Sequence, residues 1–271
     1  MTNIDVPDGH LHVERHGAPD RTTVILLHGG GLDSRMWDDQ LTALSRHHHV
    51  VAVDARGHGA STTPTAPFRH ADDVAAVIEG LNCGPAVLIG LSMGAQTATE
   101  TALEYPGLVR ALILSGAGTH RPEFTDPWIL RIQDRLDAAA KATDAQTWIE
   151  TFCEFASGPE RTLNDVEPSV VERLRAMVAD TIGTHYRPDS VGPTFVTGPV
   201  DRLTELNLPV LAVCGAADSP DHIRMAREVV DATGGDTVLI AGTGHYPNME
   251  RPSEFNTACL DFLTGVEHHG R

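Results

Sequence analysis

The residues most informative about chemistry form a short serine motif flanked by glycines. The sequence Gly-Leu-Ser-Met-Gly occupies residues 90–94, directly after the aliphatic run 86–89 and at the start of a helical pattern. A G-x-S-x-G match is common by itself, but between a strand and a helix it indicates a sharp turn that exposes the serine hydroxyl. We therefore predict that Ser92 is a nucleophile. An incidental serine in a glycine-rich turn is the alternative interpretation.

A nucleophilic serine needs hydrogen-bond donors for the oxyanion that forms on the attacked carbonyl. The N–H of Met93 is one candidate, because the N-terminus of a helix favours negative charge. The sequence His-Gly-Gly-Gly at 28–31 directly follows the aliphatic run 24–27 and fits an HGGG-type oxyanion loop. We choose the N–H of Gly30 as the second donor, with Gly31 as the close alternative.

Position in the chain selects a general base among the 15 histidines. His245 comes shortly after residues 238–240, the last strand-like run, and is the preferred base. His58 also follows a strand and is the one serious rival. The others that we considered belong to the first hairpin or to the C-terminal tail.

A carboxylate must orient the imidazole of the base. The run 210–214 is followed by Asp218 and, three residues later, by Asp221. Asp218 is nearer to the end of the strand and is our choice. The resulting order along the chain is serine, aspartate, histidine, which is the order found in α/β-hydrolase folds.

The elements that must position these residues alternate along the chain. Aliphatic runs at 24–27, 50–53, 86–89, 111–114, 210–214 and 238–240 alternate with helical patterns at 36–45, 71–81, 93–105, 223–230 and 253–263. Asp8-Gly9 indicates a hairpin turn near the N-terminus. This alternation predicts an α/β fold with a mostly parallel, doubly wound sheet covered on both faces. Ligands bind beyond the carboxyl ends of the strands in such sheets.

The alternation stops between about residues 118 and 206, where every pattern is helical. We expect residues 119–204 to form an inserted helical cap, or lid, within a core made of residues 1–118 and 205–271. Trp148, Phe152 and Phe155 of this stretch follow one another at helical spacing. They are expected either to pack within the cap, which is the favoured interpretation, or to line an apolar substrate pocket.

Three further residues are candidates for the substrate pocket. Trp37 follows the glycine loop and has the same two interpretations as the cap aromatics, with core packing favoured. Gly31 and Tyr246 are the other two.

Composition limits the partners of the chain. With 20 Lys and Arg against 37 Asp and Glu, the formal net charge is −17, which argues against nucleic acid and anionic membranes as partners. The 4 cysteines contain no CxxC pair and the N-terminus does not resemble a leader, so we expect reduced thiols in a cytoplasmic protein. The run of histidines at 47–49 is interpreted as solvated loop residues, and no metal site is expected. A small-molecule substrate is the expected partner, and a homodimer is left open.

The motifs together resemble the α/β-hydrolase family. Four segments are similar to the corresponding parts of that family: the glycine loop at 26–31, the segment 53–61 with its D-x-R-G-x-G-x-S pattern, the serine motif and the histidine segment 244–252. The resemblance implies a Ser–His–Asp hydrolase without a cofactor, and a structural role for His58. The overall pattern is most similar to the enol-lactonase and small-esterase branch.

The expected reaction is cleavage of a carboxylic ester or lactone of a small, mainly apolar substrate through an acyl-enzyme. Epoxide hydrolases and haloalkane dehalogenases of this fold use an aspartate where this chain has Ser92, which argues against both. Two alternatives remain. One is a carbon–carbon bond hydrolase of ring-cleavage products with the same triad, and the other is a hydrolase-like ligand receptor with low turnover.

Overall fold

The computed structural model describes residues 2–119 and 124–269. An eight-stranded sheet forms its centre, in the order β1-β2-β4-β3-β5-β6-β7-β8. β2 is antiparallel to both of its neighbours, β1 and β4, and all other neighbouring strands are parallel. The strands are β1 (Thr2–Val6), β2 (Gly9–His16), β3 (Thr23–Leu27), β4 (His49–Val53), β5 (Ala86–Leu91), β6 (Val109–Ser115), β7 (Val210–Gly215) and β8 (Asp236–Ile240).

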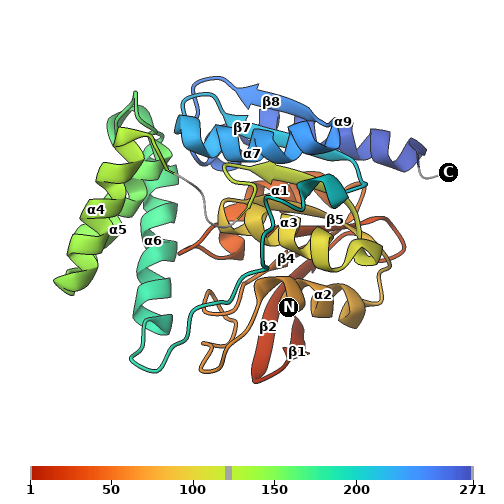
Figure 1. The fold of residues 1–271 in the computed structure, drawn as a ribbon, viewed down its shortest axis with the longest axis horizontal. Coiled ribbons are helices and arrows are strands. Elements are labelled where there is room, and N and C mark those ends of the chain that lie inside the picture. Colours follow the sequence, from red (N-terminus) through yellow and green to blue (C-terminus); the bar gives the residue numbers. More distant parts are fainter. Residues whose placement is uncertain (1, 120–123, 270–271) are drawn as a thin grey trace.

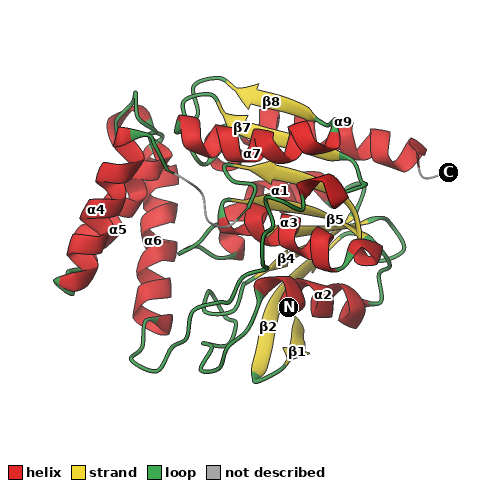
Figure 2. Cartoon of the chain, viewed as in Figure 1, coloured by secondary structure: helices red, strands yellow, loops and turns green. Residues whose placement is uncertain are grey.

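Helices cover both faces of this sheet (Figure 2). They are α1 (Asp38–Leu44), α2 (His70–Leu81), α3 (Met93–Glu104), α4 (Pro127–Lys141), α5 (Ala145–Cys153), α6 (Pro168–His185), α7 (Pro220–Thr233), α8 (Pro247–Glu250) and α9 (Pro252–His269). Successive strand residues enter two different hydrophobic clusters, because side chains alternate between the faces of a strand. In β3, Leu26 packs into the cluster that contains α1 and α9 residues, and Ile25 into the cluster that contains α2, α3 and α7 residues.

Local sequence explains where two helices near the candidate site begin. Asp126 accepts a hydrogen bond from the N–H of Trp128 at the start of α4, and Ser219 accepts one from Asp221 at the start of α7. Each of these two N-cap residues is followed by a proline at the first helical position, where the missing N–H leaves no donor unsatisfied. The start of α7 is therefore fixed just after the end of β7.

Helices α4, α5 and α6 lie between β6 and β7 in the chain and form a separate group at the left of Figure 1. Ion pairs join this group to the core. Arg161, between α5 and α6, contacts both carboxylate oxygens of Glu250 in α8, at 2.8 and 3.0 Å. Arg173 of α6 donates to Asp39 of α1 at 3.0 Å. The three helices fall within the interval 119–204 expected for a cap. The described residues of this interval are called the cap below.

The α/β fold with a mostly parallel sheet, predicted from the alternating pattern, is confirmed. Two local features differ from it. The helical pattern at 36–45 starts as a 3-10 turn, Ser34–Trp37, and becomes α-helical only at Asp38. β8 is the edge of the sheet and leaves Val238 and Leu239 exposed at 37% and 41%, so helices do not cover both faces of this edge.

Within residues 2–119 and 124–269, no helix is both long enough and apolar enough to cross a membrane. All four cysteines are free thiols, and Cys153, Cys214 and Cys259 are buried.

A buried ion pair holds the loop after β4 against α2. The guanidinium of Arg56 donates to the two carboxylate oxygens of Asp73, with Nε at 3.0 Å and Nη2 at 2.5 Å, and Nη1 donates to the carbonyl of Pro7. Both side chains are about 95% buried, and the Phe68 ring packs against the guanidinium. Because the pair is bidentate and buried, each charge depends on the other for its solvation.

Replacing Asp73 with Asn is expected to destabilise the fold by about 3 kcal/mol or more, because it leaves the guanidinium of Arg56 buried without its counter-charge. Urea unfolding of the two proteins measures this difference. Glu150→Gln is the matched control, since it removes one carboxylate from the half-exposed pair with Arg175, and should cost about 0.5 kcal/mol or less. Equal losses in the two variants would contradict the assigned importance of burial.

Candidate active site

Ser92 occupies the turn between β5 and α3. Its backbone has φ 54° and ψ −116°, an unusual conformation for a residue other than glycine. Its N–H donates to the carbonyl of Ser115 at 2.8 Å, which ties the turn to the end of β6. A Cβ at Gly94 would lie 2.0 Å from the carbonyl oxygen of Leu27, and one at Gly90 would lie 2.2 Å from the carbonyl oxygen of Gly94. The predicted tight turn is therefore present, and it places the serine at the N-terminus of α3.

His245 and Asp218 lie in direct contact. The Nδ1 of His245 donates to the Oδ2 of Asp218 at 2.8 Å, and the two side chains are buried. Asp218 follows β7, and His245 follows β8. The two residues are brought together because these parallel strands are neighbours whose last residues, Gly215 and Ile240, pair in register.

The electrostatics of the pair favour a charged aspartate and a neutral histidine. Burial alone would raise the pKa of Asp218, but the imidazoles of His245 and His222 hold it well below its ordinary value. Burial lowers the pKa of His245, Asp218 opposes that effect, and the balance is a lowered pKa. A lowered pKa keeps the imidazole unprotonated, and so able to accept a proton, at pH values below the ordinary pKa of histidine.

The loop that carries His245 is held by the cap. The N–H of Gly244 donates to Glu250 at 2.7 Å, and Glu250 is in turn bound by Arg161 from the segment between α5 and α6. The N–H of His245 donates to the carbonyl of Phe155, also from that segment. The base candidate is therefore positioned by residues on both sides of the cavity.

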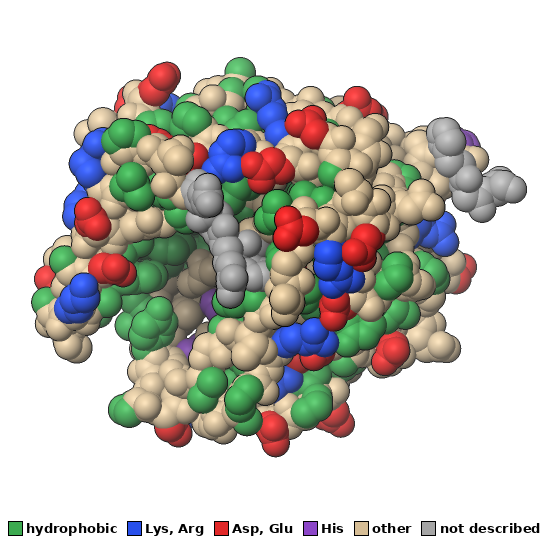
Figure 3. Space-filling model, viewed as in Figure 1, with side chains coloured by type: hydrophobic (Ala, Val, Ile, Leu, Met, Phe, Trp, Pro, Cys, Tyr) green, Lys and Arg blue, Asp and Glu red, His purple; other side chains and the backbone are tan. Residues whose placement is uncertain are grey.

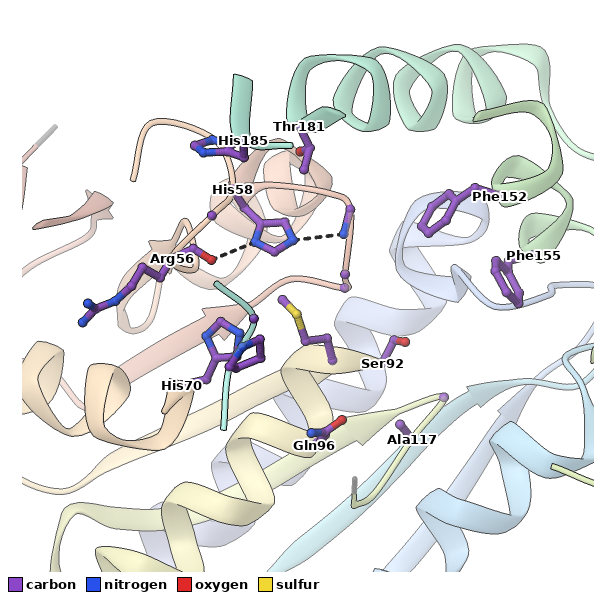
Figure 4. A pocket seen from close by; sticks show the side chains of 18 of the residues that line it. Arg56, His58, His70, Ser92, Gln96, Ala117, Phe152, Phe155, Thr181 and His185 are labelled. Carbon is purple, nitrogen blue, oxygen red and sulfur yellow. Dashed lines mark hydrogen bonds between the residues drawn. The ribbon is translucent and has the colours of Figure 1, made fainter. Parts of the chain in front are cut away.

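The two rival residues have other partners. The carboxylate of Asp221 accepts hydrogen bonds from the backbone N–H groups of Thr125 and Asp126 at 2.7 Å each, and so ties the start of the cap to α7. Both ring nitrogens of His58 are used by the backbone. Its Nδ1 donates to the carbonyl of Arg56 at 3.1 Å, and its Nε2 accepts from the N–H of Gly31 at the same distance (Figure 4).

The hydrogen bond to His58 distinguishes between the two proposed oxyanion donors. Because the N–H of Gly31 points to the imidazole of His58, it is not free to bind an oxyanion. Gly30 lies beside the turn between β5 and α3, since a Cβ added to Gly30 would be 3.8 Å from the Cβ of Met93. The N–H of Met93 is in the first turn of α3, whose N–H groups lack partners within the helix. Gly30 and Met93 thus remain the pair of candidate donors.

Ser92 and His245 line the same cavity, which has a volume of about 600 Å³. Figure 3 shows it as a hollow between the cap and the core, with histidine side chains visible inside. Trp148, Phe152 and Phe155 line it from the cap. Trp148 and Phe152 are stacked with ring centroids 5.4 Å apart, so these aromatics pack on one another and also form a wall of the cavity.

The remaining pocket candidates fall into two groups. Gly31 and Tyr246 line the cavity. Trp37 does not belong to its described lining, and its placement in the pocket is therefore wrong. Its side chain is fully buried in the core, with its ring 6.1 Å from that of Phe255 on α9. Trp37 lies at the end of the 3-10 turn that follows the glycine loop, and its ring packs against α9 rather than lining the cavity.

The described lining of the cavity carries no acidic side chain and little net charge. Arg56 is its one cationic side chain, and Asp73 neutralises it. Five histidines also line it: His58, His70, His185, His222 and His245. Burial lowers the pKa of His70 to about 3, and burial together with His28 and His70 lowers the pKa of His58 well below its ordinary value. These two rings are therefore neutral at physiological pH.

Two residues of the site were not found from the sequence. His222 donates its Nδ1–H to the other oxygen of Asp218 at 2.8 Å, and its position four residues after Asp218 on a helical stretch is the signal that could have indicated it. Gly116, directly after β6, has φ +65°, and a Cβ there would lie 2.5 Å from the Cε1 of His245. The signal in the sequence that could have indicated Gly116 is a glycine directly after a central strand.

One group among the described residues has the spacing of metal ligands. Asp218, His222 and His245 offer ligand atoms within 4.8 Å of one another. Hydrogen bonds from both imidazoles to the single carboxylate account for that proximity. The cluster therefore fits a hydrogen-bonded acid–base site.

Replacing Gly116 with Ala is expected to lower the catalytic rate by about 100-fold or more, because the new methyl group displaces the imidazole of His245 and a small misplacement of a catalytic group is costly. The rate of hydrolysis of an activated ester measures this, and circular dichroism verifies that the variant is folded. Gly183→Ala is the matched control, since a Cβ there would meet nothing within 4 Å. An unchanged rate in Gly116→Ala would contradict the close contact.

Comparisons with known proteins agree with this geometry. The family model described as "Alpha/beta hydrolase family" matches residues 24–258. The chain is 26% identical over 263 residues to 3-oxoadipate enol-lactonase 2 of Acinetobacter baylyi, which covers 94% of this chain and 93% of that protein. It is 27% identical over 268 residues to a carboxylesterase of Bacillus subtilis, with 95% and 85% covered.

A solved structure shares the fold over nearly the whole chain. The enol-lactonase of Burkholderia xenovorans superposes with a TM-score of 0.77 at 23% identity, over 97% of this chain and all of that one. At that identity the likeness concerns the fold alone. With the family model spanning the serine motif, Asp218 and His245, the chain belongs to the α/β hydrolase family.

Proposed function

We propose that this protein is a serine hydrolase that cleaves a carboxylic ester or lactone of a small, uncharged and mainly apolar substrate. The observation that carries the proposal is the buried Asp218–His245 hydrogen bond beside a cavity that Ser92 also lines. A strained serine at a helix N-terminus, a neutral imidazole and an ionised carboxylate are the three components of acyl transfer.

In the proposed first step, the Nε2 of His245 takes the proton of the Ser92 hydroxyl while the serine oxygen attacks the carbonyl carbon. The N–H groups of Gly30 and Met93 bind the oxyanion, and Asp218 stabilises the imidazolium. His245 then gives the proton to the leaving oxygen, and the bond between that oxygen and the acyl carbon breaks. Water attacks the acyl-enzyme with the same base, which releases the acid and restores Ser92.

The kind of substrate follows from the walls of the cavity. Trp148, Phe152 and Phe155 offer apolar surface, and Arg56, the cation in the described lining, already has a carboxylate partner. A carboxylate on the substrate would have to leave water without gaining a free counter-charge, which is unfavourable. We therefore propose that neutral acyl groups are preferred, and that the cap of residues 119–204 forms the part of the pocket that selects them.

Ser92→Ala is expected to abolish turnover of p-nitrophenyl esters and of simple lactones, and to remove labelling by a fluorophosphonate probe. The variant should unfold at the same urea concentration as the wild-type protein. Ser190→Ala is the matched control, because Ser190 lines the same cavity but its hydroxyl donates to the carbonyl of Arg187. Labelling or hydrolysis retained in Ser92→Ala would refute the serine mechanism.

The same assays separate the alternatives. A low-turnover receptor would be labelled on Ser92 but would release product only once per protein molecule. A carbon–carbon bond hydrolase would be labelled and would prefer ring-cleavage products to all the esters and lactones tested.

The preference for neutral acyl groups predicts a second result. A p-nitrophenyl ester with a terminal carboxylate should show a kcat/KM at least about 10-fold lower than its methyl-capped analogue at pH 7.5, because burial of an unpaired carboxylate costs more than 1.4 kcal/mol, where 1.4 kcal/mol corresponds to about tenfold. The methyl-capped ester has the same chain and thus controls for length. A preference for the charged ester would show that the cavity presents a free cation.

A further inference from the structure

Asp218 is the acceptor for two imidazoles. His222 lies in the first turns of α7 and its Nδ1 is 2.8 Å from Oδ1, while the Nδ1 of His245 is 2.8 Å from Oδ2. The N–H of Ser219 also donates to Oδ1, at 2.7 Å. The three side chains of the cluster are all less than 10% exposed. One buried carboxylate therefore has both of its oxygens occupied before any substrate binds.

These hydrogen bonds define the tautomer of each ring. Asp218 is ionised, because its pKa lies well below its ordinary value despite burial. An ionised carboxylate can only accept hydrogen bonds, so each ring carries a proton on the Nδ1 that faces Asp218, and the neutral His245 ring has its lone pair on Nε2. The two rings are close and tilted, with centroids 4.1 Å apart and 32° between their planes. His222 and His245 thus form a matched pair on one acceptor, and both line the cavity.

Within residues 2–119 and 124–269, few other charged or titratable groups face this pair. From the histidine loop, the Tyr246 ring contacts that of His245 at 5.2 Å. From the cap, the Phe155 ring lies 5.9 Å from that of His245 and 6.0 Å from that of His222. The Arg161–Glu250 ion pair holds the neighbouring Gly244. The negative charge that stabilises a protonated His245 is therefore that of Asp218, which His222 shares.

We propose that His222 is a positioning residue for the reaction described above: its Nδ1–H holds the Asp218 carboxylate in the orientation that His245 requires and draws part of its charge away from His245. This inference depends on the proposed function. It assigns His222 no contact with the reacting atoms. It gives the cluster two measurable properties, an aspartate whose rotation is restricted and a base that stays unprotonated to lower pH.

The first property concerns the rate. With the Ser219 N–H as the single donor on Oδ1, the Asp218 carboxylate could still turn about its Cβ–Cγ bond, and the imidazole of His245 would then lose its fixed direction. The Nδ1–H of His222 is a second donor on the same oxygen and restricts that rotation. His222 is therefore expected to raise kcat, because the orientation of the base matters in the chemical step, and to change KM very little.

The second property concerns pH. Hydrogen bonding of His222 to Asp218 leaves less negative charge to stabilise an imidazolium at His245, and any positive charge on His222 would repel it. Both effects lower the pKa of His245, in the same direction as its burial. Without the His222 donor, that pKa should rise and the acid limb of the kcat/KM profile should move to higher pH.

Two substitutions separate the hydrogen bond from the rest of the ring. In His222→Asn the side-chain amide nitrogen takes the place of Nδ1, so the donor to Asp218 is kept and the titratable ring is lost. In His222→Leu the donor is lost and an apolar side chain of similar size remains. His185→Asn is the matched control, because His185 also lines the cavity but bonds to Thr63 and the carbonyl of Gly59.

For His222→Leu we expect a loss of about 10- to 100-fold in kcat with a nearly unchanged KM for a neutral p-nitrophenyl ester. Its acid limb should move to higher pH. His222→Asn should recover most of the rate and the wild-type position of the acid limb, and His185→Asn should leave that limb where it is. Unfolding in urea checks that each variant is folded.

An NMR titration of the His245 ring makes the result independent of turnover. The pKa of His245 should rise in His222→Leu and stay close to the wild-type value in His222→Asn. If wild-type protein hydrolyses no ester and Ser92 is not labelled, the proposed function fails, and the titration still decides whether His222 shares the charge of Asp218. A wild-type rate and titration in His222→Leu would overturn the inference. Equal defects in the Asn and Leu variants, with a raised KM, would assign His222 to packing of the cavity wall.

Discussion

The buried charge of Asp218 is the constraint around which the site is built. Two other buried carboxylates of the protein have guanidinium partners, since Asp73 pairs with Arg56 and Glu250 pairs with Arg161. The hydrogen-bond donors described for Asp218 are two imidazoles and one backbone N–H. A guanidinium would neutralise the charge permanently. Imidazole and backbone donors stabilise the carboxylate without a permanent positive charge and leave its field available when the imidazole of His245 becomes positive, which is when a serine hydrolase needs it.

The topology of the sheet explains how residues far apart in the chain reach this charge. The parallel strands β5, β6, β7 and β8 are neighbours in the sheet, and the loops that follow them carry Ser92, Gly116, Asp218 and His245 in turn. Gly116 lies between the serine and the acid–base pair, and its lack of a side chain leaves the space that the His245 ring fills. The cap then fixes the last loop through Arg161 and Glu250, so that core and cap jointly set the position of the base.

The parts that follow from chain order and periodicity could be predicted. The parallel sheet, the turn at Ser92, and the loops of Asp218 and His245 all follow from aliphatic runs and the residues directly after them. Contacts between elements could not be predicted in this way. Trp37 illustrates this limit, because the sequence does not show in which direction the turn after the glycine loop points, and so whether the ring faces α9 or the cavity. His222 illustrates it too, since a histidine on a helix shows no partner until the rotation of that helix is known.

The choice between Gly30 and Gly31 depended on a third residue, His58, far away in the sequence. Its neutral ring connects two backbone groups, since it accepts from Gly31 and donates to the carbonyl of Arg56. A neutral imidazole can donate at one nitrogen and accept at the other, which no charged side chain can do. Protonation of His58 would remove the acceptor and release the N–H of Gly31. Burial lowers the pKa of His58 and also that of His245. The same desolvation thus keeps one histidine an acceptor for the glycine loop and the other a base for Ser92.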